Sequence, residues 1–68
     1  MSTSVYKKIE LTGTSSVSIE DAVQTAIQKA GESVRGISWF EVVETRGRID
    51  GSQVTQWQVT VKVGFAVD

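Results

Sequence analysis

The chain of 68 residues contains no cysteine, no histidine and no proline. The lack of cysteine excludes disulfide bonds and thiolate metal sites, and the lack of histidine removes the commonest metal ligand and general base. The carboxylates form no convincing inward-facing pair, and Glu41 alone on an outer face is a weak general base. We therefore expect no catalytic residue, no metal site and no enzymatic activity.

An excess of charge and long apolar runs are also missing. The net charge is −1 and the isoelectric point is about 5.3, which gives no general attraction for nucleic acid or anionic membrane. No apolar run approaches the roughly 20 residues that span a bilayer. The polar start, residues 1–4, leads into charged residues and predicts no signal peptide. We expect a cytoplasmic protein with no nucleic-acid or membrane partner.

The length allows one small domain, residues 1–68. Such a domain buries a modest fraction of its surface, and it usually needs disulfides, a metal or oligomerisation for stability. The first two are excluded by the composition. Self-association is therefore the expected source of additional stability.

Two patterns fill the first half of the chain. Apolar and polar residues roughly alternate from Val5 to Thr12, which predicts a half-buried strand that residues 13–16 end. A helix is expected to begin at Ser18, which can cap its first turn, and to stop near Gly36. Spacings of three and four give this helix one apolar stripe, formed by Ile19, Ala22, Val23, Ala26, Ile27, Ala30 and Val34.

Two further strands are expected at about Ile37–Ile49 and Gln53–Val67. They are joined at Asp50-Gly51, which is the strongest short-range signal for a hairpin. With these two residues as the loop, Phe40 faces Val61 and Val42 faces Val59, and all four point toward the helix.

The same register sends a second set of side chains to the outer face of the sheet. Trp39 then lies opposite Lys62, Glu41 opposite Thr60, and Val43 opposite Gln58, whereas a slip by one residue would bury Glu41. An indole and an amide on this face cannot stabilise the chain's own core. They indicate contact with another copy of the chain or with a flat ligand.

The lengths of these elements favour self-association as well. About 17 helical residues cover roughly 26 Å, whereas about 14 strand residues extend over roughly 46 Å. The overhanging part of the hairpin, including Trp57 or Phe65, needs cover from neighbouring copies, because monomers rarely leave such a surface open.

Nearly the whole chain resembles the dodecins. The similarity is carried by Trp39-Phe40-Glu41-Val42, by Arg46-Gly47 and by several flanking segments, namely Tyr6-Lys7-Lys8 with Glu10, Gly13-Thr14-Ser15, Trp57-Gln58-Val59 and Lys62-Val63-Gly64-Phe65. The run beginning at Trp39 is typical of the bacterial flavin-binding branch, and a related calcium-binding branch lacks this tryptophan.

The resemblance implies an α+β fold of order β-α-β-β, whose three-stranded antiparallel sheet (order 1-3-2) wraps around the helix. It also implies that twelve copies form a hollow, roughly spherical shell with two flavins stacked between tryptophans in each pocket. Such a shell would store, sequester or photoprotect flavin. FMN is favoured in bacterial relatives, and riboflavin, FAD and lumichrome remain open.

The resemblance assigns three residues to the flavin site. Trp39 would stack on the flavin ring, Gln58 would pair with its pyrimidine edge, and Arg46 would donate to a carbonyl or a phosphate. Each has an alternative: Trp39 as a subunit-interface anchor, Gln58 as an ordinary strand residue, and Arg46 as a partner of Glu44 or Asp50. By its even number Arg46 is expected on the helix side, unless a bulge near Gly47 redirects it.

Coenzyme A is a further possible ligand, because some relatives bind it on the shell. The arginine that often follows the Gly-Phe pair in the family is Ala66 here, which weakens that expectation. The alternative to flavin storage is thus a module that binds coenzyme A or another nucleotide, or a purely structural assembly.

Overall fold

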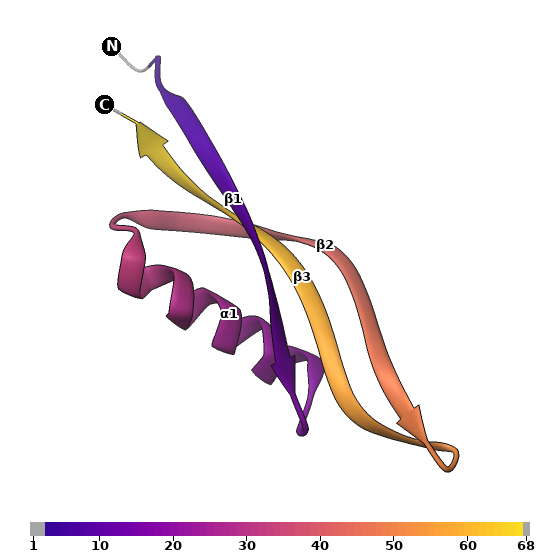
Figure 1. The fold of residues 1–68 in the computed structure, drawn as a ribbon. Helices are drawn as coiled ribbons and strands as arrows, with labels where there is room; N and C mark the ends of the chain where they lie inside the picture. Colours follow the sequence, from indigo (N-terminus) through magenta and orange to yellow (C-terminus); the bar gives the residue numbers. More distant parts are fainter. Residues whose placement is uncertain (1–2, 68) are drawn as a thin grey trace.

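The computed structural model describes residues 3–67 and has the predicted β-α-β-β architecture. Its elements are β1 (Val5–Ser15), α1 (Ile19–Ser33), β2 (Ile37–Asp50) and β3 (Gln53–Val67). The strands form one antiparallel sheet in the order β1-β3-β2, and α1 lies along one of its faces (Figure 1). The predicted fold class and strand order are confirmed.

Strand β1 is longer than the sequence pattern predicted: it continues past Thr12 to Ser15. Its partner β3 still offers backbone groups there, and Ser15 pairs with Trp57. Gly13 lets this part of the strand approach the helix. A Cβ atom at Gly13 would collide with the carbonyl oxygen of Ala22 and lie 2.9 Å from the Cβ of Ala26.

Helix α1 begins as predicted. The backbone N–H of Asp21 donates to the Ser18 hydroxyl at 3.0 Å, so Ser18 is the N-cap. The helix ends at Ser33, earlier than the apolar stripe suggested, because Val34 is already extended and only its N–H closes the last turn on Ala30. Gly36, at φ 76°, then turns the chain into β2.

The hairpin turn is displaced by one residue from the predicted Asp50-Gly51 loop. The loop residues are Gly51 and Ser52, with φ of 59° and 70°, and Asp50 pairs with Gln53. Two consecutive positive φ angles suit the right-handed twist of a tight hairpin. For residues 39–42 the displacement shifts the partner along β3 by two positions, so these side chains keep their predicted faces.

The shifted register corrects the predicted pairs at the start of β2. Phe40 faces Val63 instead of Val61, and Val42 faces Val61 instead of Val59. On the outer face Trp39 is paired with Gly64 and Glu41 with Lys62.

A bulge at Val43 corrects a second prediction. Val42 pairs with Val61 and Glu44 pairs with Thr60, so Val43 is an extra residue on β2 and does not face Gln58. An extra residue reverses the alternation of faces beyond it. Arg46 therefore lies on the outer face, directly opposite Gln58, and not on the helix side. A further register shift, between Arg48 and Ile49, lies close to Gly47, where the sequence pattern allowed for a bulge that redirects Arg46.

The core lies between α1, β1 and β3. It consists of small and β-branched side chains: Ala22, Ala26, Ala30, Val59, Val61 and Val63. Trp57 packs against this core, as predicted. Phe40 and Val42 were expected to join it, yet they are 47% and 48% exposed. The reason is the strand order, which places β2 at the sheet edge, beyond the two strands on which α1 packs.

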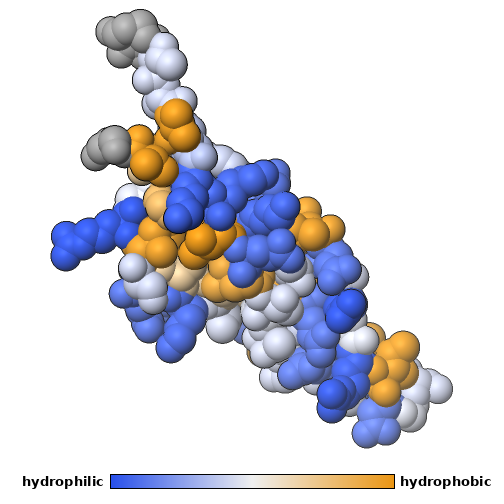
Figure 2. All heavy atoms as spheres, turned by 45° about the horizontal axis from the view of Figure 1, so that its top comes forward, coloured by the Kyte–Doolittle hydropathy of each residue, from blue (hydrophilic) through white to orange (hydrophobic). Residues whose placement is uncertain are grey.

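Strand β2 is therefore uncovered over almost its whole length. None of its residues is buried, and only Ile37 is partly covered. The hairpin also extends beyond the start of α1, where Ile49 and Val54 are exposed (Figure 1). Figure 2 shows hydrophobic surface both at this tip and at the opposite end of the molecule, near the termini. The expected overhang of the hairpin is thus present.

Substitution of Gly13 by alanine tests the close contact of β1 with α1. Gly13→Ala should lower the free energy of unfolding by roughly 1–3 kcal/mol, because the new methyl group must displace helix backbone. Gly31→Ala is the matched control: nothing lies within 4 Å of its Cβ, and alanine raises helix stability by up to about 1 kcal/mol. Urea unfolding at equal subunit concentration measures both, and equal stabilities would contradict the contact.

Candidate functional site

The indole of Trp39 lies across Gly64 on the outer face of the sheet. Trp39 and Gly64 are paired residues of β2 and β3, and a Cβ atom at Gly64 would collide with three atoms of the indole ring. Trp39 is 37% exposed and does not belong to the hydrophobic core. The sheet supports one side of the ring, and part of the indole remains accessible.

Two side chains from β1 flank the indole. Tyr6 lies with its ring centroid 6.0 Å from that of Trp39, at an interplanar angle of 52°. The Lys8 Nζ atom lies 5.9 Å from the Trp39 ring centroid. We call Tyr6, Lys8, Trp39, Glu41 and Gly64 the Trp39 platform. It combines an aromatic surface with a cation over the indole ring.

Lys8 also forms the ion pair of the platform. Its Nζ lies 3.0 Å from Oε2 of Glu41, and both side chains are half-exposed. The hydrogen bond and the charge of Lys8 hold the pKa of Glu41 below its ordinary value of 4.5, with a smaller contribution from Lys62. Glu41 is therefore an anion at neutral pH, which agrees with its weakness as a proton carrier.

Gln58 and Arg46 form a second group on the outer face. They are paired across β3 and β2. The Gln58 Nε2 donates to Oε1 of Gln56 at 2.8 Å, and Nη2 of Arg46 lies 3.4 Å from Oε2 of Glu44. Both contacts join neighbours on the same strand and face.

The two groups are far apart within one chain. Gln58 precedes Gly64 by six residues on β3, which corresponds to roughly 20 Å. The sequence pattern suggested a separation of about four residues, and the displaced turn accounts for the difference of two. The structure thus brings Gln58 and Arg46 together but does not bring Trp39 to them.

Tyr6, Lys8 and Gly64 were not predicted as site residues. Their role depends on which residues of β1 and β3 align with Trp39, and this requires the register of all three strands. The glycine itself was an available signal, because a glycine inside a regular strand often marks a close approach of another group.

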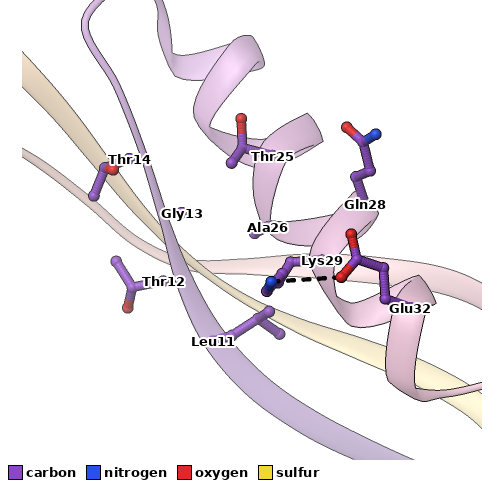
Figure 3. Close-up of a pocket in the computed structure, with 9 residues that line it drawn as sticks. All are labelled: Leu11, Thr12, Gly13, Thr14, Thr25, Ala26, Gln28, Lys29 and Glu32. Atoms are coloured by element: carbon purple, nitrogen blue, oxygen red, sulfur yellow. Dashed lines mark ion pairs between the residues drawn. The ribbon is translucent and has the colours of Figure 1, made fainter.

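A larger hollow lies elsewhere, between the free edge of β1 and α1 (Figure 3). It measures about 310 Å³, and its lining includes Leu11, Gly13 and Ala26. Lys29 and Glu32 in its wall form an ion pair at 3.4 Å, and both side chains are largely exposed. None of the predicted site residues lines it, so we place the candidate site on the Trp39 platform.

Residues 3–67 contain neither a cluster of metal ligands nor a membrane-spanning helix. Within this range, no three acidic side chains lie close enough together to hold a metal ion. No helix among the same residues is long and apolar enough to cross a membrane.

Comparison with known proteins identifies the family. Residues 5–68 match the family described as Dodecin. The chain belongs to the dodecin family. Its sequence is 45% identical over 64 residues to Dodecin of Thermus thermophilus, covering 94% of this chain and 93% of that protein. It is 36% identical over 62 residues to Calcium dodecin of Mycobacterium tuberculosis, with coverages of 91% and 87%.

The dodecin fold is shared at the level of coordinates. The structure of dodecin from Streptomyces coelicolor superposes with a TM-score of 0.91 at 40% identity, over 100% of this chain and 97% of the other. The sequence resemblance to dodecins is thereby confirmed.

A double-mutant cycle tests the support that Gly64 gives to Trp39. Gly64→Ala should lower the free energy of unfolding by roughly 1–3 kcal/mol, because the methyl group and the indole cannot share one place. In a Trp39→Ala background the same change should be neutral within about 0.5 kcal/mol. Chemical unfolding of the four variants measures the coupling, and an equal cost in both backgrounds would show that the ring does not lie on Gly64.

The Lys8–Glu41 pair predicts a measurable acid titration. Because the pKa of Glu41 is lowered, the pair contributes stability above the unfolded-state pKa, and this contribution is lost as the pH falls through the folded-state pKa. Lys8→Met should move the pKa of Glu41 back up toward 4.5, whereas Lys7→Met should not. NMR titration of the Glu41 carboxyl carbon measures the shift, and an unchanged pKa in Lys8→Met would refute the pairing.

Proposed function

We propose that this dodecin is a non-enzymatic flavin-binding protein whose sites lie between copies of the chain. The observation that carries the proposal is the indole of Trp39, which lies across Gly64 on the outer face of the sheet and is 37% exposed. An oxidised isoalloxazine ring is flat, broad and electron-poor, so an indole stacks well on it. Such stacking contributes about 0.5–1.5 kcal/mol beyond the burial of area.

Gln58 and Arg46 supply the polar contacts in this proposal. A glutamine amide offers one acceptor and two donors, which match the alternating carbonyl and N–H groups of the flavin's pyrimidine edge. The Arg46 guanidinium can donate to a ring carbonyl or to the phosphate of FMN. It lies beside Gln58 on the same face, which supports a joint role.

One chain cannot place both groups on the same flavin ring. The distance of roughly 20 Å along β3 exceeds the length of the three-ring system. We therefore assign Trp39 of one copy and Gln58 with Arg46 of another copy to each site. This arrangement needs an oligomer, and the uncovered apolar surface of β2 provides a reason for one to form.

The oligomer we propose is a closed dodecameric shell. Phe40 and Val42 on β2, and Ile49 and Val54 at the hairpin tip, are apolar and exposed in the single chain. Contiguous apolar surface of this kind is usually buried in a protein–protein interface. A closed assembly covers these residues in every copy, whereas an open chain of copies leaves some uncovered.

The proposed role is storage and photoprotection, with FMN as the favoured ligand. An indole in contact with an oxidised flavin permits very fast electron transfer, which quenches the excited state. A calcium-binding role has less support, since Ca²⁺ takes six to eight oxygen ligands, and the platform holds one carboxylate, already paired with Lys8.

Flavin titration tests the proposal. FMN fluorescence should be quenched on addition of the protein, and Trp39→Leu should weaken binding by at least about tenfold, because the stacking surface is removed. Trp57→Leu is the control for loss of an indole, since Trp57 packs against the core. Both variants should keep the subunit number found by native mass spectrometry.

Two results would contradict this assignment. Unchanged affinity in Trp39→Leu would remove the indole from the flavin site. Dissociation of the assembly in Trp39→Leu, but not in Trp57→Leu, would make Trp39 an anchor of the subunit interface instead.

A further inference from the structure

Lys8 is placed next to the indole by the register of all three strands. Lys8 on β1 and Trp39 on β2 are both paired with Gly64 on β3, so the three residues form one row across the outer face. The indole lies across Gly64, and the Lys8 ammonium lies over the Trp39 ring, 5.9 Å from its centroid. A cation thus lies within a few ångströms of the stacking surface.

A stacked ligand comes within reach of this ammonium. Stacked rings lie about 3.5–4 Å apart, and a ring broader than the indole extends beyond its edge. The ammonium then meets either the rim of the ligand or a substituent that folds back over the ring. In both cases it faces the ligand as a donor with a full positive charge, which favours an anionic partner.

Lys8 can exchange its present partner at little cost. It is held by Glu41 in a half-exposed ion pair, and such pairs contribute little to stability. Lys62 is the register partner of Glu41 on β3, and its charge also lowers the pKa of Glu41. Glu41 therefore keeps a cation on the neighbouring strand when Lys8 turns to a ligand.

We infer that Lys8 is a specificity-determining residue of the platform, whose ammonium binds an anionic substituent, a phosphate ester, of the stacked ligand. The inference rests on the proposed flavin function and goes beyond it, because it distinguishes phosphorylated from unphosphorylated ligands. Exchange of the ion pair is the physical step: the phosphate replaces the carboxylate of Glu41 on Lys8. Stacking on Trp39 contributes equally to both kinds of ligand.

The test compares FMN with riboflavin, which have the same ring and differ by the phosphate. Binding is measured by fluorescence quenching for the wild type, Lys8→Met and Lys7→Met. Methionine keeps the apolar stem without the charge. Lys7→Met is the matched control, because this substitution removes the same charge one residue away. Lys7 pairs with Phe65, in the next row of the sheet.

We expect Lys8→Met to weaken FMN binding about tenfold and to change riboflavin binding by less than about twofold. Lys7→Met should change neither by more than about twofold. Glu41→Gln should strengthen FMN binding a few-fold, because it removes the competitor for Lys8. Added salt should reduce the preference for FMN in the wild type but not in Lys8→Met.

Failure of the inference and failure of the flavin proposal give different results. Equal losses for FMN and riboflavin in Lys8→Met, or no loss for either, overturn the role of Lys8 while flavin binding stands. If Lys7→Met weakens FMN binding as much as Lys8→Met does, the loss is due to net charge, and this result also overturns the role of Lys8. A wild-type protein that quenches neither flavin overturns the flavin proposal, and the role of Lys8 with it.

Discussion

The architecture of this dodecin depends on a helix that can cover only part of its sheet. A helix of 15 residues packs on β1 and β3, whereas β2 and β3 contain 14 and 15 residues in the extended conformation. The strands are therefore about twice as long as the helix. Because β3 is central, Val59, Val61 and Val63 in its middle are fully buried, and β2 remains exposed at the edge. The surface available for assembly follows from this mismatch.

The same constraint leaves the outer face of the sheet free to bind. No helix or strand among residues 3–67 covers that face, so its side chains do not pack against α1. The row Lys8–Gly64–Trp39 makes an aromatic surface with a cation over it, and the bulge at Val43 places Arg46 opposite Gln58. These two groups are separated along β3, so in the proposed site they come from two copies. In this proposal, assembly and ligand binding follow from the same sheet geometry.

Much of this arrangement could be predicted from the sequence. The alternation in Gln53–Val67, the cap at Ser18 and the family resemblance together gave the fold, the strand order and the outward direction of Trp39. The turn was displaced because Ser52 adopts a positive φ, a choice that residue type alone does not determine. The bulge at Val43 was missed because Val42-Val43-Glu44 has no feature that distinguishes an extra residue from regular alternation. Phe40 and Val42 were assigned to the core because the pattern shows which face is apolar, but not how far the helix reaches.

The central claim is that a flavin site exists only where copies of this chain meet. Native mass spectrometry with added riboflavin tests it most directly, because it gives the number of chains and of bound ligands in the same particle. Twelve chains with flavin bound, and loss of every flavin when the particle dissociates into single chains, is the predicted result. A single 7.4 kDa chain that retains flavin would contradict the account.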